Sequence, residues 1–227
     1  YDCAGNCVVA VDCNGNCAGT DVEDECGVCD GDGIPQGECD CDGNIDLGCG
    51  CGAAGAASGY TCDGTPSNFA NVQSTSQAFY FFSDATIDGQ SLSADDWVGA
   101  FNGQTCVGAR RWGDCTGSTC DVTAGGVDGA ATADYMSYGD VPTFQIFDVS
   151  TGSYLETVAS ADIAPWENNL SAGIGDSITL SNRIDGCTDS SACNYDQGAN
   201  SDDGSCTYAP ANYDCAGNCI VALDCNG

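Results

Sequence analysis

The chain has 227 residues, of which 20 are Cys, 34 are acidic and three are basic, and it contains neither His nor Lys. A net charge of −31 argues against a nucleic-acid-binding protein and against attraction to anionic membranes. Without His or Lys the chain lacks the commonest general bases and Schiff-base amines, so the composition also argues against an enzyme.

The cysteine content predicts an extracellular or cell-surface protein, because reducing compartments do not maintain this many disulfides. An even number of Cys permits ten disulfides without specifying their connectivity. A metal–thiolate protein is the alternative, and the absence of His disfavours it. No apolar run approaches the length of a membrane span, so we expect no membrane insertion. The chain begins at Tyr1 with neither Met nor a signal peptide, which predicts a processed product or a piece of a longer chain.

Cysteine placement predicts three regions: residues 1–62 with eleven Cys, 63–185 with three, and 186–227 with six. Aromatic and paired apolar residues concentrate in the middle region. The expected fold class is therefore mainly β, with a central β-sandwich or jelly-roll flanked by disulfide-rich, calcium-binding irregular arms.

The N-terminal arm is repetitive. Tyr1–Ala10 (YDCAGNCVVA) and Val11–Thr20 (VDCNGNCAGT) share Asp, Cys, Gly, Asn and Cys in register, and Asp40–Asn44 (DCDGN) echoes them. Repeats this short cannot bury a hydrophobic face, so they stack or are held by disulfides and ions. Gly and Asn supply the positive-φ turns that such repeats need.

Within this arm, Cys26-x-x-Cys29 resembles a redox or zinc pair, but its acidic flanks disfavour a thiolate and predict structural disulfides. Cys39-x-Cys41 and Cys49-x-Cys51 are too closely spaced to pair internally without strain, so each should bridge outward. The other expected half-cystines are Cys3, Cys7, Cys13, Cys17, Cys106, Cys115, Cys120, Cys187, Cys193, Cys206, Cys215 and Cys219.

The central region predicts strands and hairpins. Gln77–Ser83 is an aromatic-rich strand, and 97–101 and 104–110 form a hairpin around Asn102-Gly103, typical of a type I′ turn. A second hairpin joins 143–149 to 153–158, and 178–180 is a closing strand. No convincing amphipathic helix is present.

Single residues of the central region carry further expectations. Cys115 and Cys120 pair locally, which leaves Cys106 to reach an arm. Trp97 belongs to the core, whereas Trp112 and Trp166 are possible contact surfaces, including for sugars.

Two polar features were also considered. Asp95 and Asp96 imitate a catalytic carboxylate pair but face opposite sides of a strand, so we expect them to begin the hairpin or bind an ion. Asn169 begins a glycosylation sequon.

Clustered acidic residues predict calcium. Asp30, Asp32, Asp40 and Asp42 alternate with other residues, an arrangement that lets carboxylates converge on Ca²⁺. The second set is Asp196, Asn200, Asp202 and Asp203, closed by Gly204. The alternative for both is an acidic loop in solvent.

Cys29–Asn44 (CDGDGIPQGECDCDGN) resembles thrombospondin type 3 and related Asp-rich calcium repeats. Gly186–Cys206 (GCTDSSACNYDQGANSDDGSC) looks like a repeat of very large secreted proteins of marine bacteria, and Asp95–Arg110 is similar to a β-sandwich segment of such surface proteins. The resemblance implies an extracellular, multi-modular, calcium-loaded architecture and no catalytic activity.

The two ends of the chain match. Tyr1–Gly15 and Tyr213–Gly227 are identical at 13 of 15 positions, with an offset of 212 residues. We therefore expect a structural subunit of an extracellular fibre or surface array that assembles head to tail with itself. A carbohydrate-binding adhesin module that contacts glycans is the alternative. Residues 1–212 contain 17 Cys, an odd number that mildly favours a discrete subunit over an exact tandem repeat.

Overall fold

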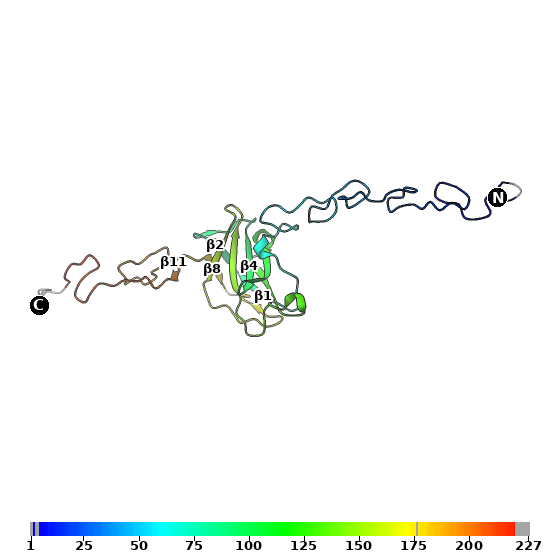
Figure 1. Ribbon diagram of the computed structural model, residues 1–227. Coiled ribbons are helices and arrows are strands. Elements are labelled where there is room, and N and C mark those ends of the chain that lie inside the picture. Colours follow the sequence, from blue (N-terminus) through cyan, green and yellow to red (C-terminus); the bar gives the residue numbers. More distant parts are fainter. Residues whose placement is uncertain (1, 3–4, 176, 221–227) are drawn as a thin grey trace. The chain divides into compact units, whose positions relative to one another are not determined.

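The structure is a computed structural model that describes residues 2, 5–175 and 177–220. It divides into two compact units, Tyr1–Ser67 and Asn68–Gly227 (Figure 1). The fold is mainly β, as expected. Helix among the described residues is limited to three single turns of 3₁₀-helix: η1 (Ser67–Phe69), η2 (Trp112–Asp114) and η3 (Ala130–Thr132). None of these has the length and apolar character needed to cross a membrane.

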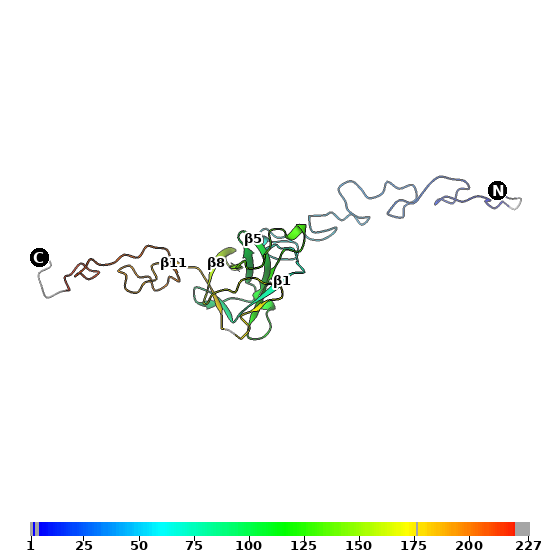
Figure 2. The same cartoon turned by 90° about the horizontal axis from the view of Figure 1, so that it is seen from below.

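The N-terminal unit consists of loops and tight turns without strand ladders (Figure 2). Isolated β-bridges such as Val11 to Cys17 and Glu23 to Cys29 close its turns. None of the described residues 2 and 5–65 is buried. Hydrophobic burial therefore contributes little to this unit, and other interactions must hold its conformation.

The second unit contains a seven-stranded sheet with the order β3-β2-β10-β8-β7-β4-β5. Its strands are β2 (Asp84–Ile87), β3 (Gln90–Ser91), β4 (Trp97–Asn102), β5 (Thr105–Arg111), β7 (Thr143–Asp148), β8 (Ser153–Ala159) and β10 (Thr179–Asn182). Neighbours are antiparallel except β2 and β10, which are parallel.

Two smaller sheets complete this unit. A three-stranded sheet has the order β6-β1-β9, where β6 is Cys120–Gly125, β1 is Gln77–Phe82 and β9 is Ser171–Ala172. A two-stranded parallel sheet pairs β11 (Asp185–Gly186) with β12 (Ser201–Asp202). This last pairing explains why the C-terminal cysteine-rich residues group with the second unit, whereas cysteine placement alone separated residues 186–227.

The main core joins the three-stranded sheet to the seven-stranded one. Alternate residues of β1 are buried, among them Tyr80 and Phe82, as the period-two pattern of a strand requires. Both rings meet Phe144 of β7 edge to face, with ring centroids 5.6 Å and 4.9 Å apart. Aromatic pairs in this geometry add to the stabilisation from buried area.

A second hydrophobic cluster covers the opposite face of β4 and β7. Phe69 is fully buried and packs edge to face against Phe101, Phe147 and Tyr154. A Cβ on Gly99 would lie 2.9 Å from the rings of both Phe69 and Phe101, so Gly99 allows this close packing. Strand β4 is consequently buried on both faces.

The structure confirms the two hairpins, β4–β5 and β7–β8, and corrects the first turn. Asn102 pairs with Thr105, so the two-residue loop is Gly103-Gln104 rather than Asn102-Gly103. Only Gly103 of these residues has positive φ, whereas a type I′ turn requires two such residues. A β-bulge between Ala100 and Phe101 in the ladder shifts the register by one residue and moves the loop.

Candidate functional site

An aspartate organises each tight turn of the N-terminal unit, as Asp12 illustrates. The backbone N–H of Asn16 donates to Asp12 Oδ1 at 2.7 Å, and the Asn16 side-chain amide donates to Oδ2 at 3.2 Å. The Asp12 N–H donates to the Asn16 carbonyl and the Gly15 N–H to the Asp12 carbonyl, both at 3.0 Å. Gly15 has φ +84°, which residues with a Cβ rarely adopt. The motif Asp-x-x-Gly-Asn therefore forms a five-residue turn by itself.

The same two hydrogen bonds recur in the other copies of the motif. These are Asp2 with Asn6, Asp40 with Asn44, and Asp214 with Asn218. A related turn at Asp24 has Val28 in place of Asn and gains a donor from Gly33 N–H at 2.9 Å. The backbone N–H of Val28 is the largest cause that lowers the pKa of Asp24 from its usual value.

These contacts favour the ionised carboxylate. The side-chain amide of Asn44 is the main cause of a lowered pKa at Asp40, and that of Asn218 at Asp214. The sequence analysis noticed the repeated letters but assigned no role to the asparagines. Their constant place four residues after Asp was the available signal, since an Asx side chain closes turns of this length.

Disulfides link these turns with a regular stagger. The pairs are Cys7–Cys17, Cys13–Cys29, Cys26–Cys41, Cys39–Cys51 and Cys49–Cys62. Each loop begins before the previous one closes, so that Cys13 precedes Cys17 in the chain. We call this series the disulfide ladder. It confirms that the Cys26/Cys29 pair and the two Cys-x-Cys pairs bridge outward instead of internally.

The C-terminal residues continue the same stagger. Cys187 pairs with Cys206 and Cys193 pairs with Cys215, with Cα atoms 4.8 Å and 5.1 Å apart. Cys219 is also in a disulfide. Cys3, another expected half-cystine, lies outside the described residues. Overlapping loops of 12 to 22 residues restrict the unfolded chain, so they stabilise segments that lack a core.

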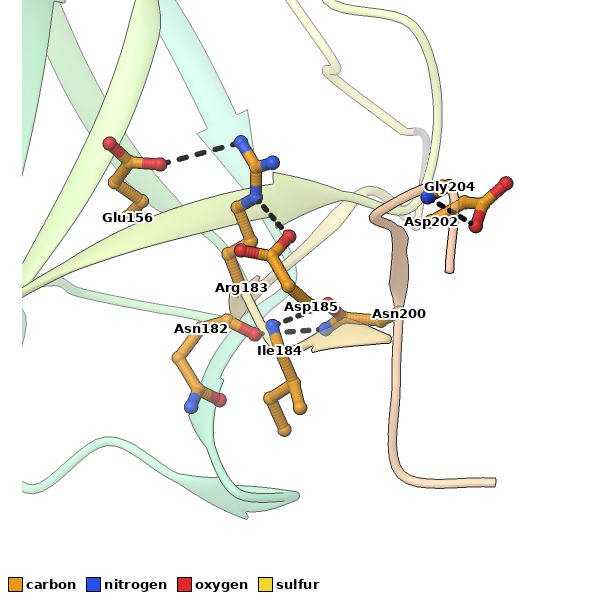
Figure 3. Close-up of polar contacts among 8 residues, drawn as sticks. All are labelled: Glu156, Asn182, Arg183, Ile184, Asp185, Asn200, Asp202 and Gly204. Carbon is orange, nitrogen blue, oxygen red and sulfur yellow. Dashed lines mark hydrogen bonds and ion pairs between the residues drawn. The ribbon is translucent and has the colours of Figure 1, made fainter. Parts of the chain in front are cut away.

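Asn200 attaches the C-terminal segment to the end of strand β10 (Figure 3). Its Oδ1 accepts the Ile184 N–H at 2.8 Å, and its Nδ2 donates to the Asn182 carbonyl at 2.8 Å. Beside it, Arg183 bridges Asp185 at 2.7 Å and Glu156 at 3.4 Å. Asn200, expected as a calcium ligand, has a clamping role in this structure.

The predicted calcium carboxylates do not form compact clusters among the described residues. Asp30, Asp32 and Asp42 are exposed, and Asp40 holds the turn described above. Asp202 and Asp203 each accept the backbone N–H two residues later, from Gly204 and Ser205. Asp196 does the same with Gly198.

Over the described residues, one group of three Cys, Asp or Glu ligand atoms lies within 4.8 Å, and it consists of Cys39, Asp40 and Cys51. Its two sulfurs are joined to each other, so neither is available as a thiolate. The arrangement therefore does not fit a metal–thiolate centre. It also brings no three of the expected calcium carboxylates together, and calcium binding stays a prediction.

Cys106 does not reach an arm, so that prediction was wrong. It lies on β5 as a free, buried thiol, with its sulfur 3.4 Å from the Phe69 carbonyl oxygen. Burial raises its pKa to about 11, which keeps it protonated and unreactive. The prediction that Cys115 pairs with Cys120 is confirmed.

The tryptophans occupy other environments than expected. Trp166 is 6% exposed, belongs to the main core and donates its indole N–H to the Ala124 carbonyl at 2.9 Å. It therefore cannot serve as a contact surface, because its loop folds back over β6. Trp112 packs against the core and is half-buried. Trp97, expected inside, is also half-buried, since it lies on the face of β4 opposite to Val98.

Asp95 and Asp96 have separate structural roles at the start of β4. Asp96 is buried and accepts the N–H groups of Ser93 at 2.7 Å and Val149 at 3.0 Å. Asp95 is exposed and pairs with Arg111. These roles agree with residues that begin a hairpin. Asn169 is exposed with φ +66°, and its glycosylation stays a prediction.

Comparison with protein-family models, with curated proteins and with solved structures finds no match for this chain.

Proposed function

We propose that this chain is a structural subunit of an extracellular fibre or surface array that assembles head to tail with itself. The disulfide ladder is the observation that carries the proposal. It holds a segment without buried residues through overlapping covalent loops, so that tension along the chain falls on cystines and short turns rather than on a core. A persistent covalent segment of this kind suits a load-bearing or spacing element.

The remaining features support the same role. Eight disulfides require an oxidising environment, as the cell exterior provides. The two sheets that share a core support a central β-sandwich of the jelly-roll type, which acts as a folded body between crosslinked segments. The buried and hydrogen-bonded positions of Asp96 and Trp166 are structural and give no support to catalysis.

Calcium belongs to the proposal through carboxylates that remain exposed, among them Asp30, Asp32 and Asp42. A chain of charge −31 repels itself, and divalent cations bound by oxygen ligands reduce this repulsion between neighbouring segments or subunits. Because these carboxylates are not preassembled, calcium binding would need them to converge when the ion binds.

The test is sedimentation and negative-stain electron microscopy of the oxidised chain over a range of concentrations, in Ca²⁺ and in chelator. We expect extended assemblies in Ca²⁺ and fewer or shorter ones in chelator, with the reduced and alkylated chain as the control. A chain that stays monomeric at high concentration in Ca²⁺ and binds glycans on an array would contradict the fibre and support the adhesin.

A further inference from the structure

The match between the two ends of the chain extends from sequence to conformation. In both copies the Asn backbone N–H donates to the Asp carboxylate at 2.7 Å, for Asp2 with Asn6 and for Asp214 with Asn218. The side-chain amides donate at 2.8 Å and 2.9 Å, and the Asp N–H reaches the Asn carbonyl at 2.8 Å in both. The two segments are thus the same structural element, 212 residues apart.

The downstream copy is bonded to what precedes it. Cys215, the cysteine inside the second copy of the turn, pairs with Cys193, which lies 22 residues upstream. The equivalent cysteine of the first copy is Cys3, which lies outside the described residues. If the copies are equivalent, Cys3 needs a Cys193-type partner upstream of Tyr1.

A count of cysteines over one 212-residue interval leaves room for this partner and for no other. Residues 1–212 contain 17 Cys, and seven disulfides within the interval use 14 of them. Of the remaining three, Cys106 is a buried free thiol. Cys3 and Cys193 are left, and their types pair in the observed bond between Cys193 and Cys215. The odd number that disfavoured an exact tandem repeat is therefore accounted for by Cys106.

We infer that these 212 residues are one period of a tandem array, that residues 213–220 show the start of the next period, and that Cys193–Cys215 is the cystine joining the two. In such an array the Cys3 position of each period pairs with Cys193 of the preceding one. The disulfide ladder then continues through every junction. This inference rests on the proposed function and specifies its head-to-tail contact as a covalent one.

The junction forms by the chemistry of the other disulfides. The two thiols lose two protons and two electrons and become one S–S bond, while a disulfide oxidant such as oxidised glutathione is reduced to two thiols. No metal or further cofactor is needed.

The test compares the 227-residue chain with a two-period chain, in which residues 1–212 precede the complete chain. Both are refolded in a glutathione redox buffer, alkylated without reduction, digested and mapped by mass spectrometry. Val8 and Val11 at the junction, against Ile220 and Leu223 at the end, distinguish the two copies of the motif. We expect Cys3 of the 227-residue chain to be alkylated or capped by glutathione. Cys3 of the second period should be crosslinked to Cys193 of the first.

The matched control is Cys193→Ser in the first period alone. It should return the junction cysteine to the alkylated fraction while the seven disulfides within each period map unchanged, which shows that the variant has folded. The inference is overturned if the junction cysteine stays alkylated in the unmodified two-period chain. Pairing of Cys3 within its own period would also overturn it, and would mean that two copies of a small module merely flank the central domain.

The proposed function can fail separately. A two-period chain that forms the junction cystine but never associates further would remove the lateral or end-to-end assembly and leave the tandem period intact. Assembly of the 227-residue chain without the junction cystine would remove the period and leave the fibre.

Discussion

The N-terminal unit and the two-sheet region of residues 68–186 are stabilised by different interactions. The described part of the first, up to residue 65, has five disulfides and no buried residue. The second has one disulfide within it and a core in which Tyr80, Val98 and Ile146 are at most 2% exposed. Crosslinks act mainly by restricting the unfolded chain, whereas a core stabilises the folded one directly. One polypeptide thus combines both means, and each should respond to a different perturbation.

Reduction should have the largest effect on this comparison. Complete reduction removes five overlapping crosslinks from the N-terminal unit, each worth about 2–5 kcal/mol in small crosslinked domains, and nothing buried replaces them. We expect hydrogen exchange in residues 5–65 to lose all protection while β1, β4 and β7 keep theirs. Equal loss of protection in both regions would show that the sheets also depend on the disulfides.

Truncation of the core should produce the converse result. Phe82→Ala removes a buried ring that meets Phe144, and such changes cost about 3–5 kcal/mol. Thermal unfolding of the two-sheet region should shift strongly, while exchange in residues 5–65 is unchanged. Phe81→Ala, at the half-buried neighbouring position, is the matched control and should have a much smaller effect. Similar shifts for both variants would contradict the assigned face of β1.

Single turn aspartates should matter locally. Asp40→Ala removes the acceptor of both Asn44 donors, so the Asn44 amide should exchange severalfold faster. Asp42→Ala is the control because it changes the charge equally, two residues away, within the same turn. If both variants accelerate exchange alike, charge rather than the hydrogen-bonded turn would be the cause.

The smallest expected effect is a pH dependence at Asp128 in the two-sheet region. The Thr75 backbone N–H, followed by the Thr132 hydroxyl, lowers the pKa of Asp128 from 3.8 to about 2. A lowered folded-state pKa gives a contribution that is complete above pH 3.8 and is lost as the pH falls through about 2. The carboxyl chemical shift of Asp128 and exchange at the Thr75 amide should report this midpoint. In Asp128→Asn the Thr75 amide should show no titration in this range, and an ordinary midpoint near 4 in the parent chain would contradict the assignment.

The amino-acid sequence determined the features that depend on neighbouring residues. Period-two patterns located β1 and both hairpins, since alternation is a local property of a strand with one buried face. The density and spacing of Cys indicated oxidised, outward-bridging pairs, because geometry forbids closure between such close neighbours. The repeated Asp, Gly and Asn marked the turns, although their hydrogen bonds were not foreseen.

Only the tertiary structure decided features that depend on distant parts of the chain. Short strands such as β2, β6 and β9 have weak patterns and exist because β10 and β1 supply their partners. Trp166 is buried because its loop returns over β6, and Cys106 is free because Phe69 covers it. Burial and disulfide partnership are relations between segments far apart in sequence. Local composition therefore identified which residues could take part, and the packing of the chain selected which of them did.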